Sequence, residues 1–264
     1  MAKLFGLLGK IVLATVFSQS VLAQEIRVGA NVGNVPWEFR NESGKLVGFE
    51  IDLVNDISDR IGRPVRFENV PFNGLFAAVQ AGRVDMAISF ITITPKRLET
   101  VAFAQPYYDS DQAMVVTSTS PLSGVADLSG AVVGTETGST GDGWVTSNKD
   151  KLGIRDIRRY EGTAPAMLDL ASGRIDAYIF DVPNVQYFIK DKPQYRIAAR
   201  IPTHEQFSIM FAKGDDELRL KINAAIADLK RDGTLSRIYK TWFGVDPGAS
   251  SSTVRELPLP ETAH

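Results

Sequence analysis

The residues best suited to binding a carboxylate lie in the stretch 89–97. Thr94 is a favourable N-cap and Pro95 fits the first helical position, so we expect a helix to begin here with Arg97 on its first turn. The unpaired N–H groups of a helix start attract anions, and a guanidinium beside them adds a positive charge. The sequence therefore predicts one half of an anion-binding site in this stretch.

Other polar residues at expected element ends could complete a site for an α-amino acid. Such a ligand needs a bidentate arginine, helix-terminal N–H groups and one acidic acceptor for its ammonium group. Arg97 supplies the arginine, with Thr92 nearby. Ser139 and Thr140 open a second expected helix and offer further N–H groups. Asp181 ends an expected strand and can accept from the ammonium group.

Strands alternate with helices along the chain, which predicts an α/β fold with mostly parallel sheets and helices on both faces. The expected strands are 24–30, 65–70, 84–88, 112–117, 132–135, 154–160, 175–180, 195–199 and 207–212, and the main helices are 52–61, 72–81, 163–171, 184–190, 214–233 and 235–242. Ligands bind at the carboxyl ends of such strands. Four loops should therefore meet at one cleft: 31–37, 89–97, 136–140 and 181–184.

Two segments of similar plan suggest an internal repeat. Residues 81–90 and 171–180 both read as a helix end, Gly, Arg, a branched apolar residue, Asp and an apolar strand. Residues 28–31 and 133–136 form a second matched pair in the same order. This indicates two similar lobes, although the alternative is coincidence, since helix–Gly–strand is common in α/β proteins.

The composition excludes several classes of function. The 264 residues carry a net charge of −2 without a basic block, which argues against a nucleic-acid surface. With no cysteine and two histidines, cysteine catalysis and a His/Cys zinc site are excluded. Residues 138–143 match neither the phosphate loop nor the dinucleotide fingerprint. We expect no cofactor and no metal; acid–base work by Glu136, Asp142 and Asp181 stays open, but binding without catalysis is simpler.

The two ends of the chain differ from the middle. Lys3 and Lys10 followed by a short apolar run predict a signal peptide over residues 1–23, and a buried N-terminal helix is the alternative. Without cysteine there is no lipid anchor, so we expect a free protein in a Gram-negative periplasm. From residue 245 the chain turns to Pro, Ser, Gly and Thr, which predicts a flexible tail over 245–264.

In this order, a series of motifs resembles one known family. The matching stretches are Pro-Trp-Glu-Phe at 36–39, Gly-Lys-Leu-Val-Gly-Phe-Glu-Ile-Asp at 44–52, Gly-Arg-Val-Asp at 82–85, Thr-Ile-Thr-Pro-Lys-Arg at 92–97, Phe-Ala-Gln-Pro-Tyr-Tyr at 103–108, Gly-Ser-Thr at 138–140, Gly-Arg-Ile-Asp-Ala at 173–177 and Asp-Gly-Thr at 232–234. The chain resembles the periplasmic polar amino-acid-binding proteins of ABC importers, which include histidine, lysine/arginine/ornithine, glutamine and opine binders. The resemblance covers residues 26 to about 244.

The resemblance implies a type II periplasmic binding protein fold, with two α/β lobes joined by two hinge strands. Lobe one would comprise 24–110 and 206–244, and lobe two 111–205, closing over the ligand. It also implies a monomer that captures a polar amino acid or an opine-like conjugate. The closed form would deliver this ligand to an inner-membrane ABC permease.

Ligand roles carried over from the family fall on specific residues. Arg97 would clamp the α-carboxylate together with the N–H groups of Thr92 and Thr140. The α-ammonium group would contact Asp181, the Thr92 hydroxyl and the carbonyl of Phe90. Phe72 would cover the ligand.

Four further residues bear on which side chain is bound. Asn31 stands where binders of basic amino acids often place an acid, and Asn34 stands where several relatives have an aromatic residue. Glu136 replaces a common apolar residue and could recognise a cation or a hydroxyl group. Trp37 could be a ligand platform, although a place in the core is favoured.

Two other functions remain alternatives. Periplasmic cyclohexadienyl dehydratases, which act on prephenate or arogenate, are similar in fold, and Glu136 or Asp142 could then serve as the acid–base group. The chain could also dock to a sensory receptor. The Arg97 and Asp181 pair favours an amino-acid binder over the enzyme.

Overall fold

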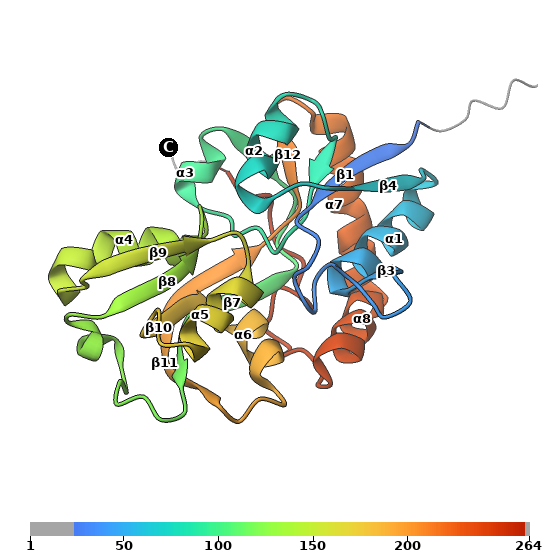
Figure 1. Ribbon diagram of the computed structural model, residues 1–264. Coiled ribbons are helices and arrows are strands. Elements are labelled where there is room, and N and C mark those ends of the chain that lie inside the picture. The colour runs from blue at the N-terminus through green and yellow to red at the C-terminus, as the bar shows by residue number, and fades with distance from the viewer. Residues whose placement is uncertain (1–23, 262–264) are drawn as a thin grey trace, which may run out of the picture.

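A computed structural model describes residues 24–261 and shows two α/β lobes, each built on a five-stranded sheet with helices packed on its faces (Figure 1). The expected two-lobed type II binding-protein architecture is therefore confirmed. The expected signal peptide, residues 1–23, lies outside the described residues.

The first lobe contains a sheet of strand order β4-β1-β5-β12-β6. These strands are β1 (Ile26–Ala30), β4 (Val65–Asn69), β5 (Met86–Ala87), β6 (Val101–Phe103) and β12 (Met210–Ala212). A small hairpin joins β2 (Phe39–Arg40) to β3 (Leu46–Val47). The helices of this lobe are α1 (Phe49–Ile61), α2 (Phe72–Gln80), α3 (Pro95–Leu98), α7 (Asp216–Arg231) and α8 (Thr234–Phe243).

The second lobe contains a sheet of order β11-β7-β10-β8-β9. These strands are β7 (Tyr108–Thr117), β8 (Val132–Glu136), β9 (Asp156–Tyr160), β10 (Ala177–Asp181) and β11 (Tyr195–Phe207). The helices are η1 (Val125–Leu128), α4 (Thr140–Leu152), α5 (Thr163–Ala171) and α6 (Val182–Ile189).

Both sheets are mixed rather than mostly parallel. In the first lobe β1 runs parallel to β4 and β5, while β12 runs antiparallel to β5 and β6. In the second lobe β8 runs parallel to β9 and β10, while β7 runs antiparallel to β10 and β11. The antiparallel pairs arise because the chain leaves and re-enters the first lobe through strands that run against the βαβ units.

Two long strands connect the lobes. We expected strands over 112–117 and 195–199, but β7 and β11 pair along their lengths from Tyr195↔Thr117 to Phe207↔Tyr108. The expected lobe borders, 110/111 and 205/206, fall inside these two strands. Irregular pairing between Ile201 and Glu205 marks the point where β11 bends toward the first lobe.

The repeat seen in the sequence is confirmed by matching backbone contacts. In the first lobe the carboxylate of Asp85 accepts the N–H of Arg27 at 2.7 Å. In the second lobe the carboxylate of Asp176 accepts the N–H of Val132 at 2.7 Å. Each aspartate therefore fixes the turn before an inner strand to the neighbouring parallel strand, which is β1 for β5 and β8 for β10. As a result β5 and β10 end at equivalent places facing the cleft.

The core gathers around Trp37, which is fully buried. Its ring lies 5.5 Å from those of Phe49, Phe90 and Phe207 and 4.8 Å from that of Tyr108. Aromatic edge-to-face contacts of this kind add to the free energy gained by burying the rings. They fix the first-lobe loop against the strands that lead to the second lobe.

The segment after α8 is packed against the lobe, although we expected a flexible tail there. Ser252 and Thr253 are buried, and their side chains hydrogen-bond to Asp109 and to the carbonyl of Tyr107. Lys230 donates to the carbonyl of Arg255. These contacts hold in place a segment that forms neither helix nor strand. Because they join residues that are far apart in the sequence, composition alone did not reveal them.

Replacing Gly48 by alanine is expected to destabilise the fold by about 3 kcal/mol or more. Gly48 has φ +144°, and an added Cβ would lie 2.0 Å from the carbonyl oxygen of Trp37. Gly44→Ala is the matched control, because φ is +79° there but the space around it is open. It should cost about 1–2 kcal/mol. Urea unfolding of both variants measures the difference, and equal losses would contradict the packing described here.

Candidate functional site

Arg97 lies at the contact between the lobes. The Thr94 side chain caps α3 by accepting the N–H of Arg97 at 3.1 Å, as expected from the sequence. The guanidinium donates to the carbonyl of Thr92 at 2.8 Å in its own lobe and to that of Gly138 at 3.2 Å in the other. One side chain thus joins both lobes.

Aromatic rings and burial define the surroundings of this guanidinium. Its carbon lies 5.6 Å from the ring centre of Phe72 and 5.1 Å from that of Phe76, within the range of a cation–π contact. Burial lowers the pKa of Arg97 to about 10, while nearby Glu205 and Asp181 oppose this change. Arg97 therefore stays positively charged at neutral pH.

The start of α4 faces Arg97 from the second lobe. Ser139 caps this helix by accepting the N–H of Asp142 at 3.0 Å, so its hydroxyl is already engaged. The hydroxyl of Thr140 donates to a carboxylate oxygen of Glu205 at 2.8 Å. Thr92, from the first lobe, donates to the same oxygen at 2.8 Å. The two threonines named from the sequence are thus brought together.

The residue that joins them, Glu205, was not identified from the sequence. It lies on β11, is 8% exposed, and contacts the side-chain nitrogen of Gln112 at 3.1 Å. Gln112, on β7, also donates to Asp181 at 3.0 Å. Gln112 carried a signal, because it is a polar side chain in an expected strand and directly precedes the apolar run 113–116. Glu205 lies between two expected strands and carried no such signal.

Asp181 is buried at the end of β10. Burial raises its pKa well above the usual range, and the neighbouring charges of Glu205 and Glu136 raise it further, while Arg97 acts in the opposite direction. A cation bound beside Asp181 would stabilise its ionised form. The position therefore fits the acceptor for a ligand ammonium group.

Glu136 forms a second acidic point, at the end of the neighbouring strand β8. Its side chain is buried, and one carboxylate oxygen accepts from the Asn31 amide across the lobes at 3.2 Å. The other oxygen has no hydrogen-bond partner among the described residues. Burial, together with the charge of Glu161, raises the pKa of Glu136 to about 8. A buried oxygen without a partner is costly, which points to a ligand donor at this place.

A buried pair of acids supports the first-lobe side of the site. Glu50 accepts the N–H of Phe90 at 2.8 Å and the hydroxyl of Tyr107, and Glu38 accepts the hydroxyl of Ser89 at 2.7 Å. Burial, then the charge of Glu50, raises the pKa of Glu38 well above its usual range. The pair stabilises a strained turn in which Ser89 and Phe90 have φ of 155° and 40°.

Three expected ligand residues have their polar groups engaged within the protein or are part of the core. The Asn34 amide donates to the carbonyl of Asn31 at 2.8 Å. The indole N–H of Trp37 donates to Asn184 at 2.8 Å, across the lobes. Phe90 is 4% exposed and packs on Trp37. The structure thus places the indole of Trp37 as a core contact between lobes.

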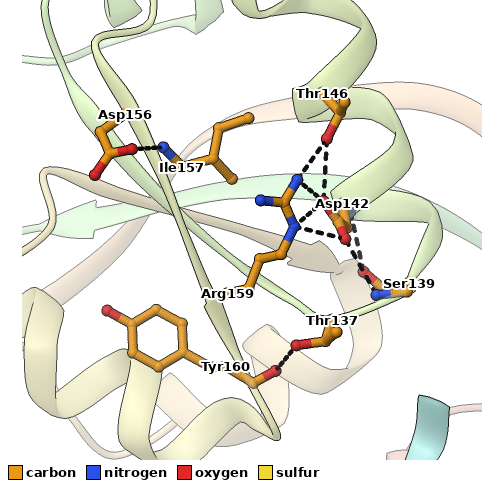
Figure 2. A network of polar contacts seen from close by, with 9 residues as sticks. Thr137, Ser139, Asp142, Thr146, Asp156, Ile157, Arg159 and Tyr160 are labelled. Atoms are coloured by element: carbon orange, nitrogen blue, oxygen red, sulfur yellow. Dashed lines mark hydrogen bonds and ion pairs between the residues drawn. The ribbon is translucent and has the colours of Figure 1, made fainter.

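A groove of about 820 Å³ opens beside Arg97 between α3 and α4. Asp142 and Arg159 line its second-lobe side and form an ion pair, with the Arg159 Nε 3.0 Å from Asp142 Oδ1 (Figure 2). Although burial alone would raise the pKa of Asp142, hydrogen bonds from Arg159 and the Gly138 N–H lower it. Asp142 is therefore held as an ionised cap of α4.

Between residues 24 and 261, no helix is both long and apolar enough to cross a membrane. In the same range no cluster of three or more His, Asp or Glu side chains could hold a metal ion.

Glu136→Gln is expected to raise the stability of the ligand-free protein increasingly with pH. The folded pKa of about 8 exceeds the ordinary value of 4.5, so the folded state holds a proton that the unfolded state has lost. The wild-type protein should therefore lose stability relative to the variant between pH 4.5 and 8, by on the order of 2–4 kcal/mol, with no further change above.

Urea unfolding at several pH values measures this difference, with exposed Glu42→Gln as the control. The control should follow the wild-type curve at every pH. If the free energy of unfolding changed with pH in the same way for the wild type and Glu136→Gln, this would contradict the burial of a carboxyl group with one unpartnered oxygen.

Comparisons with known proteins identify the family of this chain. The sequence model of the bacterial extracellular solute-binding proteins, family 3, matches residues 26–245. The histidine-binding periplasmic protein of Salmonella typhimurium is 31% identical over 236 residues, which is 86% of this chain and 90% of that protein.

Solved structures agree with this match. An ancestral arginine-binding protein bound to arginine superimposes with a TM-score of 0.80 at 34% identity, covering 84% of this chain and all of the other. An ancestral arginine-binding protein bound to glutamine gives 0.79 at 34% identity, covering 84% and 98%. The chain belongs to the bacterial extracellular solute-binding proteins of family 3.

Proposed function

We propose that this protein captures an L-amino acid with a positively charged side chain in the periplasm and delivers it to an ABC permease. The observation that carries the proposal is that Arg97 and Asp181, from opposite lobes, lie close enough for their charges to interact. Hydrogen bonds through Thr92, Glu205 and Gln112 connect them. A guanidinium and a carboxylate on facing lobes match the two charges of an α-amino acid. Closure of the lobes would bring both onto the ligand.

The backbone part of the ligand fits the Arg97 side of the network. Arg97 and the N–H groups of Thr92 and Thr140 would bind the α-carboxylate, with the ring of Phe72 beside the guanidinium. Asp181 and the Phe90 carbonyl would accept from the α-ammonium group. Burial strengthens these contacts, because charge-assisted hydrogen bonds gain from exclusion of water.

The side chain of the ligand would reach Glu136. Its unpartnered, buried oxygen can accept from a cationic or hydroxyl donor, and a cation also neutralises its charge. Asn31, the residue across the lobes, is the matching neutral contact. Related proteins have been solved with arginine and with glutamine, so the buried carboxyl group of Glu136 is what favours a cation here.

We also propose that the protein is exported, acts as a monomer and binds its ligand without catalysis. Residues 1–23 would be a cleaved export signal, and the mature chain would act as a monomer. Binding is favoured over dehydratase chemistry, because the matched relatives are named as binding proteins. Asp142, one of the two candidate acid–base groups, is engaged by Arg159.

Arg97→Ala is expected to weaken binding of L-arginine by about 2–5 kcal/mol, which is roughly 30-fold to several thousand-fold in Kd. The variant leaves the α-carboxylate without its charged partner in a buried site. Isothermal titration calorimetry gives the Kd, and exposed Lys96→Ala should stay within threefold of the wild type. An Arg97→Ala affinity within threefold as well would refute the carboxylate clamp.

Glu136→Gln should lower the affinity for L-arginine at least tenfold while changing that for L-glutamine by less than threefold. The neutral amide keeps the size of the side chain but removes the charge that a cationic ligand needs. Competitive titration of both amino acids, with an opine added to the panel, measures the selectivity. Equal losses for both amino acids would show that Glu136 does not read the side chain.

A further inference from the structure

Two buried carboxylates, Asp181 and Glu205, share one neutral donor. The side-chain nitrogen of Gln112 lies 3.0 Å from Asp181 Oδ1 and 3.1 Å from Glu205 Oε1. Asp181 is 3% and Glu205 8% exposed, so water compensates neither charge well. Two acids this close repel each other unless a cation or a proton lies with them.

Glu205 also connects the parts of the protein that move on closure. Its Oε2 atom accepts from the Thr92 hydroxyl of the first lobe and the Thr140 hydroxyl of the second, each at 2.8 Å. Glu205 itself lies on β11, one of the two strands that join the lobes. A ligand that binds Glu205 would therefore contact both lobes and the hinge at once.

Arg97 lies near these two acids but, within residues 24–261, forms an ion pair with neither. Its guanidinium is engaged by the carbonyls of Thr92 and Gly138, and no ion pair joins it to Glu205 or Asp181 among the described residues. Burial, followed by the charges of Glu205 and Glu136, raises the pKa of Asp181, and the nearby Arg97 offsets this rise only in part. A ligand ammonium group has three N–H donors and one positive charge, which is what the two acids lack.

We infer that Glu205 is a second acceptor for the α-ammonium group of the ligand, paired with Asp181 across Gln112. The inference rests on the proposed amino-acid binding and adds a hinge residue to the site. It explains how occupation of the cleft favours closure, because the ammonium group replaces the repulsion between Asp181 and Glu205 by attraction to both. Removing the charge of Glu205 should therefore weaken ligand binding and raise the stability of the ligand-free protein.

An opposite role predicts the opposite result. Glu205 would act as an internal substitute for the ligand carboxylate if its contacts with Thr92 and Thr140 had to break on binding. Glu205→Gln would then bind L-arginine more tightly than the wild type. The sign of the change in Kd separates these two roles.

The test compares probes with and without the α-ammonium group. Calorimetry of Glu205→Gln should show a Kd for L-arginine raised at least about 30-fold. The Kd for 5-guanidinopentanoate, which is arginine without its α-amino group, should change by less than threefold. Glu205→Asp retains the charge and should bind L-arginine better than Glu205→Gln. Exposed Glu99→Gln, close to Arg97 in sequence, controls for net charge and should match the wild type.

Thermal unfolding of the empty protein supplies a second readout. Glu205→Gln removes one of two adjacent buried charges and should raise the unfolding temperature by about 2–4 °C. A lower unfolding temperature together with equal losses for both probes would show a merely structural role and overturn the inference. If Glu205→Gln does not fold, Glu205→Ala, which also removes the charge, decides by the same ratio of the two Kd values, with a ratio equal to that of the wild type counting against the inference.

Ligand binding by the wild-type protein tests the proposed function separately from the role of Glu205. Failure of the wild type to bind L-arginine, L-lysine, L-histidine or L-glutamine would overturn the proposed function. Binding by the wild type together with an unchanged or tighter Kd for Glu205→Gln would overturn only the role of Glu205.

Discussion

The imbalance of charge where the two lobes meet is the constraint on which the rest of the site depends. Asp181, Glu136 and Glu205 are buried there, and the guanidinium of Arg97 is the positive group beside them. Buried carboxylates without partners cost free energy, so the closed arrangement is complete only with added positive charge. A ligand that brings more than one positive group satisfies this requirement best.

The fold brings groups from both lobes to this charged region. The matched turns at Asp85 and Asp176 make β5 and β10 end at equivalent places, so each lobe presents one strand end to the other. β7 and β11 carry Gln112 and Glu205 through the hinge. In the proposed closure, charges from both lobes would meet as the lobes approach. Because the hinge strands hold two of the polar groups, ligand binding and closure would then be coupled.

The sequence predicted the features that depend on local chemistry. The Thr94 cap, Arg97 on the first helical turn and the acid at the end of β10 follow from residue types at known positions along an element. Glu205 was missed, because strand periodicity gives no sign of which distant hydroxyls a polar residue meets. Trp37 was kept as a possible platform, because only the packing shows its N–H bound to Asn184. The docked segment after α8 was missed because its contacts are nonlocal.

The comparison of L-arginine with L-citrulline shows whether the protein selects a charged side chain, since citrulline has nearly the same shape but a neutral side chain. Calorimetry of the purified wild-type protein at pH 7 should show one L-arginine bound per chain, with a Kd at least about 30-fold lower than that for L-citrulline. Equal affinities for the two would show that the buried carboxylates do not select a cationic ligand, and would contradict the account.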